Sequence, residues 1–408
     1  MEILTAGTGI TILFKRVPSK LVSCKYYIGC GSVDEILPEQ EGLCHALEHM
    51  LFQGTNTRTW RDISTDFRKV GSYSNAETDF RHTAFEMQVA REHFEPAFEV
   101  LADQVYNSTM PEDRWKIEKG TIISEIEEFL DSPDELLGVL SMKDAFGPNY
   151  RDPIGTIENI KNADVEHLKY FKDTFYRGRN VFLSISGDFT EKQLLKIVDK
   201  YDKWQPRRCK VRQAQEFKFD PANFLTVKAG IQQSYISWIQ PIKRYNRIRE
   251  EIALDIGMDL LYNYLYEDIV WDKGLCYGIA PADFADIEGC ECISIDVSCS
   301  SDKVERMLEE VPKSIHKFFE TQITSDKIEE SRMAYMRRAL EAAEDPDSIT
   351  SWMAHTYLDG HKKDPFDEVF KGATRIKDTT IKSILTECLT ADNKLCVMVG
   401  DNEGSFNF

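Results

Sequence analysis

The sequence predicts a mixed α/β (α+β) protein that consists of two duplicated domains, each a sheet packed with helices. Two observations support this prediction. Strand-like and helix-like segments alternate along the chain, and three short motifs of the first half recur in the same order in the second half. Alternation of this kind is typical of sheets covered by helices. Recurrence at a nearly constant offset indicates a duplicated fold.

The predicted elements of the first half follow from side-chain periodicity. Strand-like runs occupy residues 9–16, 21–31 and 78–89. Apolar residues at helical spacing occupy residues 41–54, 91–107 and 112–130. These segments predict a sheet and the helices that pack on it.

The repeat is visible at turns and at strand ends. Asp-Ser-Pro-Asp at 131–134 recurs as Glu-Asp-Pro-Asp at 344–347, and the strand that ends at Gly187 has a counterpart that ends at Gly400. Asp152-Pro153 has its counterpart at 364–365, so the three pairs share almost the same offset. We therefore expect each half to run helix, acidic-Pro turn, helix, Asp-Pro turn, helix and closing strand.

The halves define predicted domain boundaries. A basic, polar segment without periodic apolar residues, 205–221, is the best candidate for a linker. It separates a first predicted domain, 1–204, from a second domain of similar fold, 222–408.

Charge and composition disfavour several classes of partner. The net charge of −19, from 69 acidic and 50 basic residues, disfavours nucleic acid and anionic membranes. No apolar run has the length of a membrane span, and the first residues do not resemble a signal peptide. Ten scattered cysteines are typical of free thiols in a reducing compartment, so we expect a cytoplasmic protein.

The most informative motif lies in the predicted helix 41–54. His45 and His49 are four residues apart in an H-x-x-E-H pattern, so they lie one turn apart on one helix face. Two such imidazoles can bind one zinc ion. Glu48 shares that face and is well placed to accept a proton as a general base without binding the metal. The alternative is a pair of solvated or buried histidines without a metal.

A catalytic zinc site needs a third protein ligand, and the helix 112–130 supplies candidates. Glu118 and Glu125 are seven residues apart and share a face. Glu125 follows the apolar pair Ile122-Ile123, which suggests a buried side. Spacing alone does not decide between Glu125 and Glu128, and a solvated acidic helix face is the alternative.

The chain resembles the pitrilysin/insulinase (M16) family of zinc peptidases over nearly its whole length. It is most similar to the single-chain members of about 45 kDa related to the mitochondrial processing peptidase β subunit. The motifs that carry the resemblance are GCGSVDE (29–35), EGLCHALEHMLFQGT (41–55), GSYSNAETDF (71–80), the segment 102–135 and the segment 155–188.

The resemblance implies a role for each residue of the site. It makes His45, His49 and Glu125 the ligands of one zinc ion per chain, because the spacing from His49 to Glu125 matches that of the family. Glu48 becomes the catalytic base, and Glu118 a supporting acid next to the ligands.

The family also implies two duplicated domains that close like a clam shell around a peptide substrate. The substrate would add to an edge strand at Asn75 and Ala76 by main-chain hydrogen bonds.

The second half carries no metal motif but contributes to substrate binding in the family. At the offset of the repeat, the metal motif becomes Met258, Leu261, Tyr262 and Arg338. Family members have a substrate-binding Arg and Tyr seven residues apart. Tyr277 matches the tyrosine, but Val270 stands in place of the arginine, and Lys273 is the nearest cation. We therefore expect a homologous subunit that supplies the missing arginine, in a heterodimer or alternatively a homodimer.

The sequence thus predicts a zinc metalloendopeptidase that hydrolyses peptides or unfolded segments, with peptide maturation as one role. Two alternatives remain open. One is a non-catalytic scaffold or binding subunit of a processing-peptidase-like complex. The other is a metal-dependent hydrolase of a different substrate.

Overall fold

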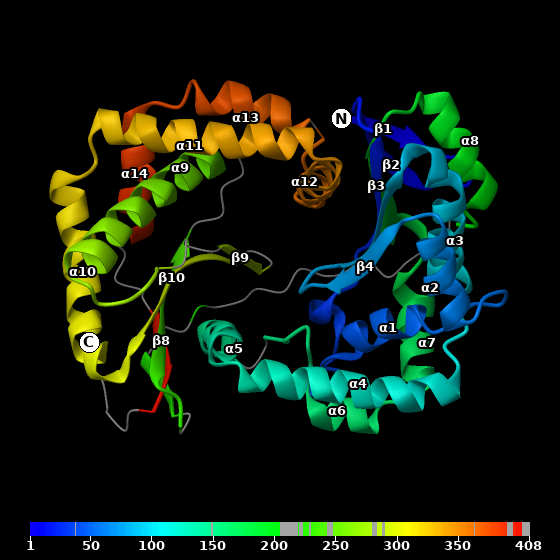
Figure 1. Cartoon of the computed structure of the whole chain (residues 1–408), viewed down its shortest axis with the longest axis horizontal. Helices are drawn as coiled ribbons and strands as arrows, with labels where there is room; N and C mark the ends of the chain where they lie inside the picture. Colours follow the sequence, from blue (N-terminus) through cyan, green and yellow to red (C-terminus); the bar gives the residue numbers. More distant parts are fainter. Residues whose placement is uncertain are drawn as a thin grey trace. The chain divides into compact units, whose positions relative to one another are not determined.

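The computed structural model describes most of the chain, and Figure 1 shows its elements. The described residues are 1–36, 38–147, 150–204, 219, 223–227, 230–242, 248–279, 284–287, 290–362, 364–389 and 395–401. The predicted linker, 205–221, lies outside the described residues except for Phe219.

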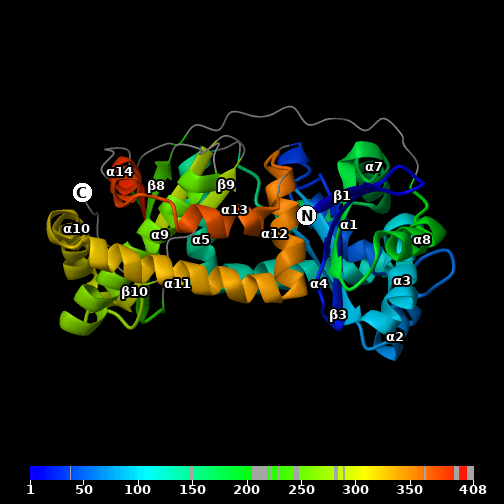
Figure 2. The ribbon, with the colours of Figure 1, turned by 90° about the horizontal axis from the view of Figure 1, so that it is seen from above.

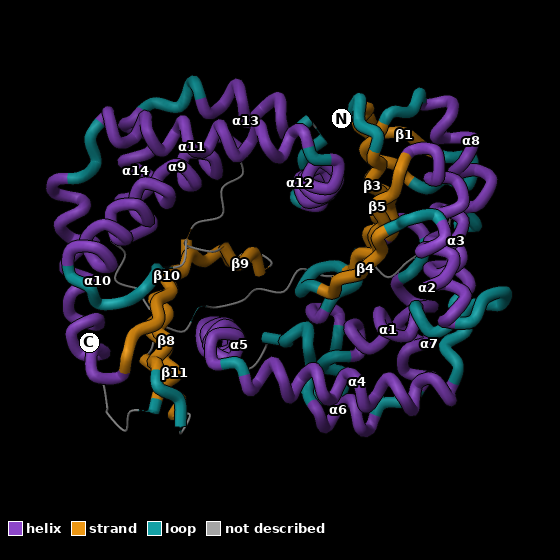
Figure 3. Tube along the Cα trace, in the orientation of Figure 1, coloured by secondary structure: helices purple, strands orange, loops and turns teal. Residues whose placement is uncertain are grey.

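The chain forms two compact units. The first contains residues 1–127, 151–213 and 340–366, and the second contains residues 128–150, 214–339 and 367–408. Each unit contains one sheet and the helices that cover it, which confirms the predicted mixed α/β class (Figure 3). The domain boundaries predicted at 204 and 222 stay predictions.

The first unit is built on a six-stranded sheet with the order β1-β2-β6-β3-β5-β4. Its strands are β1 (Glu2–Thr5), β2 (Thr11–Arg16), β3 (Leu21–Ile28), β4 (Tyr73–Thr78), β5 (Thr83–Ala90) and β6 (Val181–Gly187). Every residue of the central strand β6 is buried, as expected for a strand covered on both faces. The edge strand β4 alternates between exposed and partly buried residues.

The structure differs from the prediction at one strand. The segment 78–89 was expected to be a single strand, but only Thr78 belongs to β4, and β5 begins at Thr83. Residues 79–82 form the turn between them, in which the Asp79 amide donates to the His82 carbonyl. A turn that carries Phe80 and His82 lacks the glycine or proline that would have indicated it.

The helices from the first half of the sequence follow the predicted segments closely. They are α1 (Leu43–Leu51), α2 (Trp60–Lys69), α3 (Phe94–Asn107), α4 (Glu112–Asp131), α5 (Pro133–Phe146), α6 (Ile157–Asn162), α7 (Val165–Phe175) and α8 (Glu191–Tyr201). Apolar side chains of α1, α3 and α7 form one continuous core with β2, β3, β5 and β6.

The second unit repeats the sheet of the first. Its strands are β7 (Asn223–Val227), β8 (Gln233–Ile242), β9 (Phe284–Ile287), β10 (Cys290–Ser300) and β11 (Leu395–Gly400), in the order β7-β11-β8-β10-β9. The helices from the second half of the sequence are α9 (Ile248–Leu265), α10 (Val304–Thr321), α11 (Ser325–Glu344), α12 (Pro346–Leu358), α13 (Pro365–Ala373) and α14 (Asp378–Leu389). Of these, α12 belongs to the first unit.

Strand pairing confirms the duplication. The order β2-β6-β3-β5-β4 corresponds to β7-β11-β8-β10-β9, with one parallel pair at the same place in each sheet. The register is also repeated. Cys24 pairs with Ile185 in the first sheet, and the equivalent pair of the second sheet is Ile236 with Met398.

Each half of the sequence contributes one helix to the other unit. Helix α12 packs on β3, β6 and β2 of the first sheet, on the face opposite to α3 (Figures 1 and 2). Helix α5 packs on β11 and β8 of the second sheet. Both helices follow the repeated acidic-Pro turn, and the chain changes unit a few residues before each turn, after residues 127 and 339.

Polar bonds hold α12 on the first sheet. The buried hydroxyls of Ser184 and Ser186 donate to the carbonyls of Thr350 and Pro346 at 2.7 and 2.6 Å, and Lys25 pairs with Asp347 at 3.2 Å. Such bonds define the position of a helix more strictly than apolar contact does.

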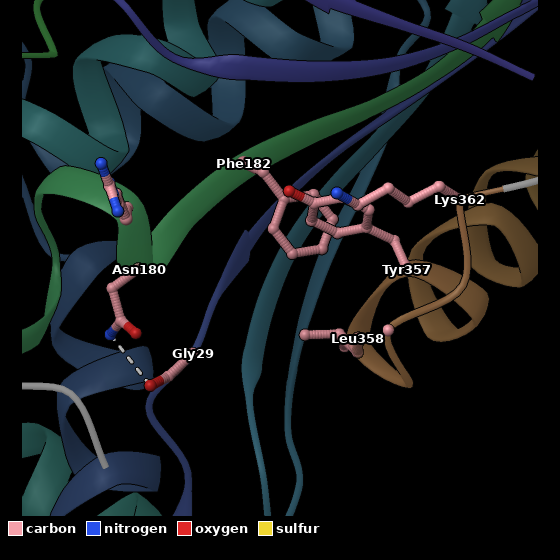
Figure 4. Close-up of a pocket in the computed structure, with 8 residues that line it drawn as sticks. Gly29, Asn180, Phe182, Tyr357, Leu358 and Lys362 are labelled. Carbon is pink, nitrogen blue, oxygen red and sulfur yellow. Dashed lines mark hydrogen bonds between the residues drawn. The ribbon is translucent and has the colours of Figure 1, made fainter. Parts of the chain in front are cut away.

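A pocket of about 340 Å³ lies beside the end of α12 (Figure 4). Phe182, Tyr357 and Lys362 are among its lining residues, and the Asn180 amide donates to the Gly29 carbonyl at 2.9 Å. The pocket contains none of the residues that the sequence singles out for chemistry.

Within the described part of the chain, no helix is both long and apolar enough to cross a membrane.

Candidate metal centre

A buried carboxylate caps the start of helix α1, which carries both histidines of the motif. The two oxygens of Glu35 accept hydrogen bonds from the Gly42 and Cys44 amides at 2.9 and 2.7 Å. These amides belong to the first turn, where helix N–H groups lack partners within the helix. The residue that follows Cys44 is His45, so Glu35 fixes the turn that presents the first imidazole.

A close backbone approach fixes the same turn from the other side. Gly42 has a φ of +94°, and a Cβ built on it would lie 2.7 Å from the Cα of Gly155. Gly155 follows the Asp152-Pro153 turn that the repeat analysis identified. Glycine is needed at both positions because any side chain would separate the two segments.

Replacing Glu35 by glutamine is expected to lower the free energy of unfolding by about 1–3 kcal/mol, because one amide of the first turn then faces an NH₂ group instead of an oxygen. Urea denaturation of both proteins measures the difference. Glu39→Gln, at an exposed position just before α1, is the matched control. Equal stability of Glu35→Gln and wild type would contradict the capping role.

Three candidate ligands converge between α1 and α4. The Nε2 atoms of His45 and His49 lie 3.1 Å apart. Glu125 places its Oε1 atom 3.8 Å from His45 Nε2 and its Oε2 atom 3.3 Å from His49 Nε2. In the part of the chain that the structure describes, these three side chains form one group in which one donor atom of each lies within 4.8 Å of the others. Two imidazoles and a carboxylate are the donor set that catalytic zinc sites use.

The surroundings give the two histidines different proton affinities in the absence of a metal. Burial and the neighbouring His49 lower the pKa of His45 to about 4. Burial also disfavours the charged form of His49, but hydrogen bonds with Glu118 and Glu125 outweigh it and raise the pKa to about 9. The same bond to His49 lowers the pKa of Glu125. The carboxylates therefore favour positive charge at His49, whereas burial and His49 disfavour it at His45.

Glu48 lies beside this group without belonging to it. Its side chain is buried, and its Oε2 atom accepts a hydrogen bond from the Thr78 hydroxyl at 2.8 Å. Burial raises the pKa of Glu48 to about 7, against the opposing effect of Thr78. A carboxyl group that titrates near neutrality suits an acid–base role.

The structure separates the two carboxylates that spacing left open. Glu125 lies with the histidines, whereas Glu128 is exposed and outside the group. Glu118, two turns before Glu125 on the same face, is buried, and its Oε2 atom lies 3.5 Å from His49 Nδ1.

The predicted substrate residues lie in two different places. Asn75 and Ala76 are on the edge strand β4, which ends at Thr78 beside Glu48, and the Asn75 side chain is exposed. Tyr277 belongs to the second unit and is 93% exposed. Val270 is partly buried in a π-helical segment, Tyr266–Asp272, that continues α9.

Lys273 is bound within its own unit. Its ammonium group pairs with Asp268 and with Glu310 at 3.1 Å, and it donates to the Ser314 hydroxyl at 3.0 Å. Because its ammonium group makes these three contacts, Lys273 is not a free cation next to Tyr277.

Comparison with known proteins identifies the family of the chain. Residues 11–152 match the model of the insulinase family (peptidase family M16), and residues 162–335 match the model of the M16 inactive domain. Together the two models span most of the chain. The chain belongs to the M16 peptidase family.

Relatives of this M16 chain include several proteins named as zinc proteases. A Bacillus subtilis protein named uncharacterized zinc protease YmxG is 25% identical over 97% of both chains. A Rickettsia bellii protein named uncharacterized zinc protease is 26% identical over 83% of this chain and 82% of its own. The mitochondrial-processing peptidase subunit beta of Dictyostelium discoideum is 30% identical over 48% of this chain and 42% of its own.

Solved structures show the same fold. A protein described as a peptidase M16 inactive domain from Pseudomonas fluorescens superposes with a TM-score of 0.88 at 16% identity, over 99% of this chain and 98% of its own. A Helicobacter pylori protease reaches the same TM-score at 15% identity, over 98% of this chain and 99% of its own.

In the second half of this M16 chain, the counterpart of the candidate ligand Glu125 is part of an ion pair. Arg338 on α11 occupies the position that corresponds to Glu125 in the repeat, and its Nη1 atom lies 2.7 Å from Asp259 Oδ1 on α9. A salt bridge therefore joins the two helices that correspond to α4 and α1.

Sequence reasoning missed the role of Glu35. The segment 29–35 was recognised as a family motif, but no residue in it received a function. An acid that lies seven residues before a glycine at a helix start is a weak signal, because the loop between them determines whether the carboxylate returns to the helix.

Proposed function

We propose that this chain is a zinc-dependent endopeptidase that hydrolyses peptides or unfolded segments. The observation that carries the proposal is the convergence of His45, His49 and Glu125 around one point, with the buried carboxyl group of Glu48 next to them. The names of the relatives support the same class of chemistry.

The donor set fits a single zinc ion. Donor atoms 3.1–3.8 Å apart can share an ion that each approaches to about 2 Å. A bound zinc ion would polarise the scissile carbonyl and make a water molecule easier to deprotonate. Three protein ligands leave a position open for water or substrate.

Glu48 supplies the proton transfer in this proposal. It takes a proton from the attacking water and donates it to the leaving amine. The Thr78 hydroxyl occupies one lone pair of the carboxylate and orients the side chain, while the rest of the group stays available to the reacting atoms.

Strand β4 supports an extended peptide as substrate. Among the described strands it pairs only with β5, so its second edge offers main-chain N–H and C=O groups. A peptide that adds there at Asn75 and Ala76 would run alongside the strand that ends at Thr78 and Glu48. The main chain would give affinity, and the exposed side chains of β4 would contribute specificity.

A homologous subunit completes the site in this proposal, as a heterodimer or a homodimer. The bonds of Lys273 to Asp268, Glu310 and Ser314 support it, because they leave Val270 without a cationic substitute in the described segment 266–279. The partner would provide the arginine. We further propose that the enzyme acts in the cytoplasm, where scattered thiols stay reduced, and takes part in peptide maturation.

Metal removal tests the proposal. The purified chain is expected to contain one zinc ion and to cleave members of a peptide library, alone or mixed with a candidate partner. Treatment with 1,10-phenanthroline should abolish cleavage, and added Zn²⁺ should restore it. A zinc content near zero would instead favour the non-catalytic scaffold.

A further inference from the structure

Arg114 joins the two helices that carry the candidate ligands. It lies in the first turn of α4, one turn before Glu118. Its Nη2 atom donates to Glu118 Oε1 at 3.2 Å, and its Nε atom donates to Gln53 Oε1 at 2.8 Å. Gln53 lies just after the end of α1, so a single guanidinium group bridges α4 and α1.

The carboxylate of Glu118 divides its oxygens between two partners. Oε1 accepts from Arg114, and Oε2 faces His49 Nδ1 at 3.5 Å. An acceptor at Nδ1 keeps a proton on that nitrogen, so that Nε2, next to Glu125 and His45, is the nitrogen that would offer its lone pair to a metal ion. The orientation of Glu118 therefore sets the orientation of the His49 ring.

The guanidinium group of Arg114 is itself held in place. It lies over the ring of Trp60, 4.8 Å from the centroid, and only 18% of the side chain is exposed. Gln53, Glu118 and Trp60 thus contact three sides of the planar group. A planar guanidinium group with several N–H donors can make these contacts at the same time, whereas the single ammonium group of a lysine cannot.

We propose that Arg114 is a positioning residue of the metal centre, which acts on His49 through Glu118. The inference rests on the proposed zinc site and assigns a role to a residue that binds neither metal nor substrate. Arg114 restricts Glu118 to the rotamer that accepts from His49 Nδ1. Without Arg114, Glu118 would gain alternative orientations in which the bond to His49 is lost.

Zinc affinity measured by competition with a chelator tests the proposal. Arg114→Gln is expected to bind Zn²⁺ about tenfold more weakly than wild type, and Glu118→Gln about 10–100-fold more weakly, as for other groups that orient metal ligands. Arg114→Lys should show an intermediate loss. Lys116→Gln, which removes an exposed cation from the same helix, should match wild type.

The double variant distinguishes positioning from general stabilisation. If Arg114 acts through Glu118, then Arg114→Gln/Glu118→Gln binds zinc no more weakly than Glu118→Gln alone. Additive losses would overturn the proposal, and so would an Arg114→Gln affinity equal to that of wild type. A wild-type chain that binds no zinc would refute the proposed function itself. Circular dichroism of the metal-free variants establishes that each one folds.

Discussion

Replacing Glu48 by glutamine is expected to lower kcat/KM for peptide cleavage by a factor of about 10²–10⁴, or to below detection, and to leave the zinc content unchanged. Glutamine has nearly the same shape as glutamate, and its carbonyl oxygen can still accept the hydrogen bond from Thr78. The amide cannot take up the proton from water. Since Glu48 lies outside the group of three donors, the metal should remain bound.

Two measurements on the same sample test this expectation. A quenched fluorescent peptide reports the rate, and metal analysis after dialysis reports the zinc content. Glu39→Gln, at an exposed position, removes one carboxylate without contact to the site and should retain full activity. A Glu48→Gln protein that cleaves at the wild-type rate would refute the assignment of the base. Loss of zinc from it would mean that Glu48 binds the metal.

Replacing Glu125 by glutamine is expected to weaken zinc binding by more than about 10²-fold and to remove activity with it. The change takes away the carboxylate that lies near both Nε2 atoms, and with it the negative charge that offsets the ion. Losing a direct ligand should cost more than the roughly 10–100-fold that outer partners contribute. Isothermal titration of the metal-free protein with Zn²⁺ measures the affinity.

Glu128→Gln is the matched control for this experiment. It makes the same chemical change on the same helix, three residues further on, at an exposed position. Its zinc affinity should equal that of wild type. If Glu128→Gln lost zinc and Glu125→Gln kept it, the assignment of Glu125 as the third ligand would be wrong, and Glu128 would take its place.

The two expectations together separate binding from chemistry. Glu48→Gln should give an inactive protein with zinc, and Glu125→Gln an inactive protein without it. Glu35→Gln and Arg114→Gln affect the same centre indirectly, through the first turn of α1 and through Glu118. A series of four variants therefore assigns each carboxylate, and the guanidinium group next to them, to a separate task.

Local sequence patterns were sufficient to predict the two helices, α1 and α4, that carry the candidate ligands. Helical periodicity located α1 and α4 to within a few residues, because each buries one apolar face in the core of its own unit. The nearly constant offset between the repeated motifs predicted the duplication, which the repeated strand order confirms. The hairpin between β4 and β5 was missed, since its turn contains residues that also suit a strand.

The sequence did not predict that α5 packs on the second sheet and α12 on the first. Both helices follow an acidic-Pro turn that was recognised as a repeat, but a turn does not specify which sheet the next helix will cover. That choice depends on side chains far apart in the sequence, such as Ser184 and Thr350. Periodicity indicates which face of a helix is buried, but it does not indicate which sheet that face packs on.

The sequence by itself determined the chemical types of the candidate ligand group: two imidazoles one turn apart, a carboxylate next to them, and acids seven residues apart on a second helix. Spacing left Glu125 and Glu128 open, and the family resemblance chose Glu125. Only the tertiary structure shows the Glu125 carboxylate next to both histidines, and Glu35 and Arg114 holding the surrounding turns. The physical reason is that spacing along a helix fixes relative direction, whereas the distance between two helices is set by the packing of the whole unit.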